Sequence, residues 1–97
     1  MNKYSYVYIV TNKRNGTLYI GVTSNIVKRV YEHRKGFVDS FSKKYKLHML
    51  VYYEQHLNIE AAITREKQLK KWNRLWKLKL IEGVNPKWRD LYHEITS

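Results

Sequence analysis

Hydrophobic and polar positions alternate at the start of the chain. Residues Tyr4 to Thr11 carry Tyr, Val and Ile in the pattern of a half-buried β-strand. Asn15-Gly16 then supplies the two residues that a tight hairpin turn favours, because both tolerate positive backbone φ angles. We therefore expect Thr17 to Val22 to return as a second, antiparallel strand.

A helical period follows the hairpin. Hydrophobic residues recur at helical spacing between Asn25 and Lys35, after three candidate N-cap residues, and Gly36 ends the pattern. Phe37 to Lys46 is polar and basic with no clean period, so we expect a loop there. His48 to Gln55 is rich in Val and Tyr and predicts a third strand.

The second half of the chain is predicted to be helical. A long pattern begins at the N-cap Asn58 and runs to Ile81, with a break expected near Asn73 and an end at Gly83. Asn85-Pro86 predicts the start of a last short helix, because Pro suits the first turn. This order favours an α/β (α+β) fold in which a small three-stranded antiparallel sheet is flanked by helices. We expect one domain over residues 1–97.

The net charge of the chain indicates which classes of partner it can bind. Its 97 residues hold 19 Lys and Arg against 8 Asp and Glu, a formal net charge of +11. This excess favours a polyanion such as nucleic acid, with an acidic membrane or ribosomal RNA as competitors. Cysteine is absent, which excludes disulfides, thiolate zinc sites and a cysteine nucleophile. The opening ten residues lack the pattern of a signal peptide or membrane span, so we expect an intracellular protein that binds no membrane.

One acidic residue lies where its helix should be apolar. Glu66 is three or four residues from Ala62 and Leu69, on the stripe expected to face the sheet. A carboxylate there is costly to desolvate unless it is paired or bound to a metal. Either Glu66 lies at the edge of the stripe and pairs with Arg65, Lys70 or a neighbouring helix, or it faces a cleft as a metal ligand. One carboxylate with waters and phosphate oxygens is a usual ligand set for Mg²⁺.

Arg29 and His33 form a second candidate pair. Four residues apart on one helix, they present a fixed cation and a titratable imidazole from the same face. Such pairs also occur on many solvated helices. This one follows directly on Tyr19-Ile20-Gly21, whose glycine would allow a backbone or ligand to approach closely.

Basic residues are concentrated in the later helical stretch. Seven cations lie between Arg65 and Lys79 against the single acid Glu66. Because like charges along one helix repel, this excess favours contact with a phosphate backbone. We expect the interleaved Trp72 and Trp76 to be core residues. The residues expected to bind nucleic acid are Lys43, Lys44, Arg65, Lys67, Lys70, Lys71, Arg74 and Lys77.

The order of these motifs resembles the GIY-YIG nuclease domain, in its small stand-alone bacterial form. Tyr6-Val7-Tyr8, Tyr19-Ile20-Gly21, Arg29-x-x-x-His33 and Glu66 follow one another with the spacing of that family over nearly the whole chain. The first element reads Tyr-Val-Tyr in place of Gly-Ile-Tyr and keeps its closing tyrosine.

Two features depart from the family pattern. Many members have an asparagine in the sequence after the glutamate. Here Asn73 is closer to Glu66 than that pattern expects, and Asn85 is farther from it. The chain also has no second domain to recognise a target.

The resemblance implies metal-dependent hydrolysis of DNA phosphodiester bonds, with one divalent ion, Mg²⁺ or Mn²⁺. One of Tyr8 and Tyr19 would activate or position the attacking water, and Arg29 would stabilise the phosphorane charge. His33 would shuttle a proton or hold the phosphate, and Glu66 would bind the metal. We expect a structure-selective endonuclease of DNA repair or recombination, located in the cytoplasm at the nucleoid.

Two other functions are compatible with the same residues. A nucleic-acid-binding module with this fold and little catalytic power would explain the basic helix and the missing recognition domain. A small ribosome-associated or RNA-binding protein would explain the charge but not Glu66. The sequence does not exclude RNA as a ligand, and it leaves open a protein partner or a dimer.

Overall fold

Three strands form the antiparallel sheet of the protein. The computed structural model describes residues 4–97, so residues 1–3 of the opening segment lie outside the described part. The strands are β1 (Ser5–Thr11), β2 (Leu18–Thr23) and β3 (Met49–His56), in the order β2-β1-β3. Both pairs are antiparallel, and the register shifts between Ile9 and Val10 where β1 meets β3. The predicted hairpin and third strand are confirmed.

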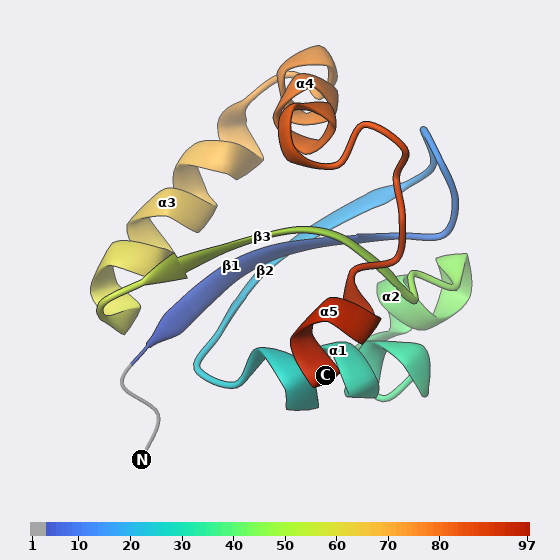
Figure 1. Ribbon diagram of the computed structural model, residues 1–97, viewed down its shortest axis with the longest axis horizontal. Coiled ribbons are helices and arrows are strands. Elements are labelled where there is room, and N and C mark those ends of the chain that lie inside the picture. Colours follow the sequence, from blue (N-terminus) through green and yellow to red (C-terminus); the bar gives the residue numbers. More distant parts are fainter. Residues whose placement is uncertain (1–3) are drawn as a thin grey trace.

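Helices cover both faces of this sheet (Figure 1). On one face lie α3 (Ile59–Lys71) and α4 (Arg74–Val84), and on the other lie α1 (Ile26–Arg34), α2 (Ser40–Tyr45) and α5 (Tyr92–Thr96). The predicted fold class is therefore confirmed. Within residues 4–97, no helix combines the length and the apolar character that crossing a bilayer would require.

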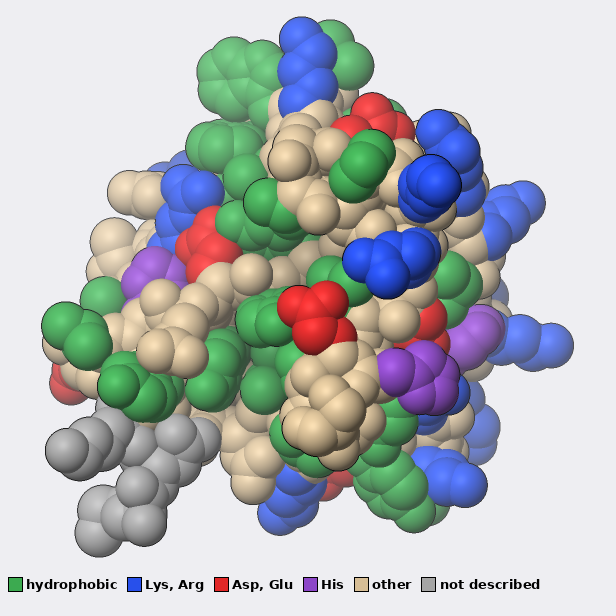
Figure 2. Space-filling model, viewed as in Figure 1, with side chains coloured by type: hydrophobic (Ala, Val, Ile, Leu, Met, Phe, Trp, Pro, Cys, Tyr) green, Lys and Arg blue, Asp and Glu red, His purple; other side chains and the backbone are tan. Residues whose placement is uncertain are grey.

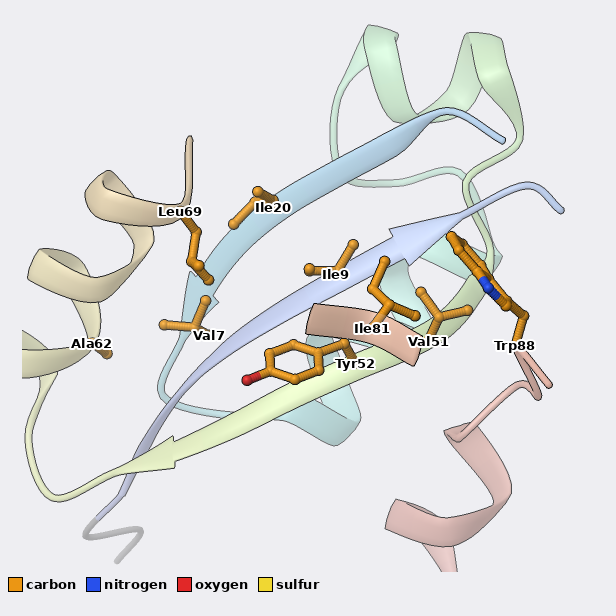
Figure 3. Packing of buried hydrophobic residues seen from close by; sticks show 9 residues of the cluster. All are labelled: Val7, Ile9, Ile20, Val51, Tyr52, Ala62, Leu69, Ile81 and Trp88. Atoms are coloured by element: carbon orange, nitrogen blue, oxygen red, sulfur yellow. The ribbon is translucent and has the colours of Figure 1, made fainter. Parts of the chain in front are cut away.

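The alternation of side chains along β1 divides the core into two clusters. Val7 and Ile9 point toward α3 and α4, where they pack with Leu69 and Ile81 (Figure 3). Tyr8 belongs to the cluster on the opposite face, because successive strand residues point to opposite faces. The central strand is buried on both sides, and it holds Tyr8 in a fixed position beneath α1.

Two helix predictions are confirmed at their boundaries. The Asn25 side chain accepts a hydrogen bond from the Lys28 amide and caps α1. The break near Asn73 separates α3 from α4, and the Asn73 side chain caps α4 by accepting from the Trp76 amide at 2.9 Å. An amide capping side chain satisfies a donor that the helix leaves unpaired.

Other local predictions are wrong. The segment expected to be a loop contains α2, because the Asp39 side chain accepts from the Ser42 amide at 2.8 Å and begins a helical turn. Helix α4 continues through Gly83 to Val84. Trp76 is 53% exposed, so it is not a core residue.

The last helix begins later than predicted, at Tyr92. Trp88 has a φ of 55°, a left-handed conformation that interrupts a helix. The buried Asn85 fixes this turn, since its amide nitrogen donates to the Val51 and Arg89 carbonyls and its oxygen accepts from the Arg89 amide. Trp88 still points inward and is 2% exposed.

Candidate active site

A glycine on β2 makes room for the phenol of Tyr8. The two residues are directly opposite each other in the register of β1 and β2. A Cβ atom on Gly21 would lie 2.8 Å from Cε1 of Tyr8, and closer still to its Cζ and Oη. Any side chain at this position would displace the ring, so Gly21 is required by the packing of Tyr8.

Tyr8, His33 and Ser42 form a buried chain of polar groups. The Tyr8 hydroxyl lies 2.9 Å from His33 Nε2, and the Ser42 hydroxyl lies 2.7 Å from His33 Nδ1. Burial, and after it the positive charge of Arg29, lower the pKa of His33 to about 4. A neutral imidazole donates at one nitrogen and accepts at the other. His33 therefore links a strand tyrosine to a serine on α2 through one continuous chain.

Tyr19 packs on this chain and reaches the surface. Its ring stacks on the Tyr8 ring with the centroids 6.4 Å apart. It also makes an edge-to-face contact with the His33 ring, with the centroids 5.0 Å apart. Tyr8 is fully buried, whereas Tyr19 lines a cleft of about 410 Å³ at the edge of β2. Asp39 and Lys70 line the same cleft. Of the two tyrosines, Tyr19 is the one that a ligand in this cleft can contact.

The two phenols remain protonated near neutral pH. Burial raises the pKa of Tyr8, and the neighbouring Tyr19 raises it further, while Arg29 acts in the opposite direction. Burial also raises the pKa of Tyr19, as does the Asp39 carboxylate. Either phenol can orient a water molecule by hydrogen bonding, but ionising it requires more than Arg29 supplies.

Arg29 and Glu66 bring opposite charges to these tyrosines. Arg29 pairs with Glu32 at 3.3 Å, one turn along α1. The charges of both Arg29 and Glu66 act on the pKa of Tyr19, so both lie near this phenol at the edge of β2, Arg29 on α1 over one face of the sheet and Glu66 on α3 over the other. The structure thus brings together the five predicted catalytic residues, which come from β1, β2, α1 and α3.

Glu66 takes the first of the two alternatives that its position raised, because it forms an ion pair with Lys70. Its side chain is 14% exposed and pairs with Lys70 at 3.2 Å. Lys70 is itself 55% exposed, so its flexible ammonium can be displaced by a divalent ion. Across residues 4–97, no cluster of three or more His, Cys, Asp or Glu side chains could form a metal cage. Glu66 therefore fits an ion that takes its other ligands from water and phosphate oxygens.

The cations expected to bind nucleic acid fall into two groups. Arg65 forms an ion pair with Glu54 at 3.0 Å, and Arg74 donates to the Asn15 and Gly16 carbonyls at 2.7 Å, so both are engaged within the protein. Lys70 and Lys77 line the cleft beside Tyr19. The other four are exposed on α2 and α3: Lys43, Lys44, Lys67 and Lys71.

Sequence reasoning missed Asp39 and Ser42. Both lie in the segment expected to be a loop. Asp39 lines the cleft, and the Ser42 hydroxyl forms a hydrogen bond with His33 Nδ1. The spacing Asp-x-x-Ser is an N-cap signal that could have indicated a helical turn. The candidate asparagines have structural roles instead, with Asn73 capping α4 and Asn85 holding the turn after it.

A model of the GIY-YIG catalytic domain matches residues 4–79. The chain belongs to the GIY-YIG family. This is a nuclease family, its members are generally metal-dependent, and their substrates are nucleic acids. The matched range contains all five residues that converge at the edge of β2.

Small bacterial GIY-YIG proteins are similar over most of their length. The UPF0213 protein of Staphylococcus haemolyticus is 39% identical over 77 residues, which are 79% of this chain and 93% of the relative. That of Clostridium perfringens is 35% identical over 91 residues, or 94% and 97% of the two chains. The solution structure of the UPF0213 protein of Bacillus halodurans has the same fold, with a TM-score of 0.57 and 24% identity over 90% of this chain and 92% of that one.

Proposed function

We propose that this GIY-YIG protein is a metal-dependent endonuclease that hydrolyses DNA phosphodiester bonds. The observation that carries the proposal is the convergence of a cleft-lining tyrosine, a guanidinium and a nearly buried carboxylate at one sheet edge. Hydrolysis of a phosphodiester needs an oriented water, neutralisation of the developing charge and support for the leaving oxygen. We further propose that the enzyme selects DNA structure and acts in repair or recombination in the cytoplasm, at the nucleoid.

Each side chain has a separate task in this proposal. Tyr19 orients the attacking water, because it is the phenol that lines the cleft. Tyr8 and His33 pack against the Tyr19 ring and thereby fix the position of its hydroxyl. Arg29 stabilises the charge that develops on the phosphoryl oxygens, and Lys70 and Lys77 bind the neighbouring phosphates.

Glu66 gives up its ion pair with Lys70 and binds the divalent ion, Mg²⁺ or Mn²⁺. Bound there, the ion would neutralise phosphate charge and support the leaving oxygen. The low exposure of Glu66 strengthens its attraction for a cation, since a partly buried charge is screened less by water.

Cleavage of nicked, branched and single-stranded DNA with Mg²⁺ tests this proposal. Arg29→Ala is expected to lower the rate about 100-fold or more, as removal of a charge-stabilising contact does. Glu66→Gln should raise the Mg²⁺ concentration needed for half-maximal cleavage or abolish cleavage. Its matched control is Glu60→Gln on the same helix, which changes an exposed carboxylate in the first turn of α3.

The outcomes separate an enzyme from a binding module. Cleavage that survives both site variants unchanged would come from a contaminant and would refute the assignment. DNA binding without cleavage in any divalent ion would identify a catalytically weak nucleic-acid-binding module with the same fold.

A further inference from the structure

A second hollow surface lies at the carboxyl end of α1. It consists of two hollows of about 310 and 360 Å³ that share Arg34, Lys35 and His48 in their walls. Tyr31 and Tyr92 also line the larger hollow, and the smaller one is also lined by His33, Gly36, Ser42, Lys43 and Lys46; we call the whole surface the basic groove. No acidic residue of the described chain lines either hollow, whereas Asp39 lines the catalytic cleft.

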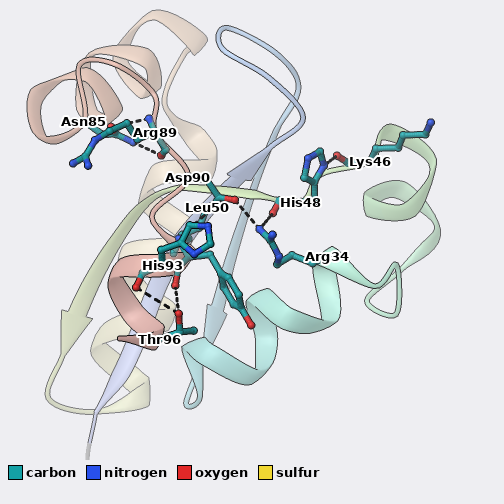
Figure 4. Close-up of polar contacts among 10 residues, drawn as sticks. Arg34, Lys46, His48, Leu50, Asn85, Arg89, Asp90, His93 and Thr96 are labelled. Carbon is teal, nitrogen blue, oxygen red and sulfur yellow. Dashed lines mark hydrogen bonds and ion pairs between the residues drawn. The ribbon is translucent and has the colours of Figure 1, made fainter.

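The guanidinium of Arg34 forms a fixed part of the groove wall. It pairs with Asp90 at 2.6 Å and donates to the His48 carbonyl (Figure 4). It also lies 4.5 Å from the centroid of the Tyr92 ring. Asp90 also accepts from the Leu50 and Tyr92 amides. Because the Asp90 carboxylate is occupied in this way, it does not neutralise the remaining cations of the groove.

Lys35 and Lys46 supply the exposed charge. Lys35 lies over the Tyr31 ring at 5.7 Å, and Lys46 follows α2 with a φ of 55° while its carbonyl accepts from His48. Cations held beside aromatic rings around a hollow suit a phosphate backbone better than a solvated helix face does. Figure 2 shows Lys and Arg side chains gathered along the edge where Figure 1 places α2.

The buried chain of Tyr8, His33 and Ser42 connects the basic groove with the catalytic cleft. His33 and Ser42 line the groove, and Tyr19, whose ring contacts His33, lines the cleft. Along α1, Lys35 is six residues beyond Arg29, which corresponds to about 9 Å of helix. One nucleic acid molecule can therefore span both surfaces.

We propose that the basic groove binds the phosphate backbone of a second segment of the substrate, so that the protein engages a branched DNA with one arm in the cleft and another in the groove. The inference rests on the proposed function in that the substrate is DNA. It adds a site for structure selectivity that includes none of Tyr8, Tyr19, Arg29 and Glu66 and that meets the predicted catalytic residues only at His33. On this proposal we expect a single straight duplex to occupy the cleft without entering the groove.

DNA binding without hydrolysis tests the groove independently of catalysis. Fluorescence anisotropy in the presence of a chelator would compare a three-way junction with a duplex of one arm. The test variant is Lys35→Gln with Lys46→Gln. The charge-matched control is Lys13→Gln with Lys87→Gln, which changes two exposed lysines outside the cleft and the groove.

The test variant should lose junction binding selectively. Two lost phosphate contacts reduce the slope of log K against log salt by about two and lower the affinity roughly 10- to 60-fold near 0.1 M salt. Duplex binding by this variant, and both affinities of the control variant, should change by less than about threefold. Equal losses on junction and duplex, or equal losses in the two variants, would overturn the groove assignment. If the wild type cleaves no DNA but the selective loss is seen, the nuclease proposal fails and the groove stands.

Discussion

Replacing Gly21 by alanine should displace the phenol on which the candidate active site is built. The added methyl group would overlap three atoms of Tyr8, a fully buried residue of the central strand. Neither partner can yield easily, because Gly21 lies in the ladder with β1 and Tyr8 is packed from every side. The ring must therefore move, and its contact with His33 at 2.9 Å must be lost.

The cost can be worked from these contacts. Overpacking of a dense core costs about 1–3 kcal/mol. The lost hydrogen bond adds about 1 kcal/mol. A total of about 2–4 kcal/mol is a large part of the stability of a domain this size and lowers its melting temperature by roughly 10–20 °C.

Thermal and urea unfolding of paired variants would measure this effect. Gly83→Ala is the matched control, since a methyl group there meets nothing within 4 Å and lies in α4, where alanine should stabilise by up to about 1 kcal/mol. In a Tyr8→Leu background, where the phenol is absent, Gly21→Ala should cost less than about 1 kcal/mol. A full cost in that background, or no cost in the wild type, would refute the reasoning.

Three further predictions concern the polar groups of the fold. Because the pKa of His33 is about 4 in the folded state, below its unfolded value, its contribution to stability is complete above pH 6.5 and is lost as the pH falls toward 4. This loss of about 3 kcal/mol should be smaller in His33→Gln, as measured by urea unfolding across that range. Arg74→Ala removes two charged hydrogen bonds to the hairpin turn and should lower the urea-derived free energy of unfolding by about 1–2 kcal/mol. Asn85→Ala removes three hydrogen bonds of a side chain that is 2% exposed and should cost about 2–4 kcal/mol, against about 1 kcal/mol for the exposed cap Asn73→Ala. Equal costs in the two asparagine variants would contradict the structural role of Asn85.

The sequence predicted those parts of the fold that depend on local signals. The turn before β2, the cap at Asn25 and the break at Asn73 are each set by neighbouring residues, and all three are present. Within the turn only Asn15 has the positive φ expected of both Asn15 and Gly16, and the strands already part at Thr11 and Leu18. The family motifs also identified residues that the fold brings to one sheet edge, although they lie far apart along the chain.

The remaining features depend on contacts between distant residues. The left-handed turn at Trp88 is held by Asn85 through the Val51 carbonyl, which no local pattern encodes. In the same way, Ser42 acquires a role only because α2 packs against His33. The sequence alone also does not show that Arg65 is engaged in an ion pair, because its partner Glu54 lies on β3 and is brought beside it only by the fold.

The turn after α4 has a consequence for how the domain can be divided. The GIY-YIG match ends at residue 79, yet the segment beyond it supplies the buried side chains of Ile81, Trp88 and Leu91 to both core clusters. Asp90 of the same segment ties the start of β3 to α1. A fragment cut at the boundary of the family match would leave part of each face of the sheet uncovered and would be expected to aggregate. The segment that contains the catalytic motifs is thus shorter than the segment that must fold cooperatively, which includes the residues after α4.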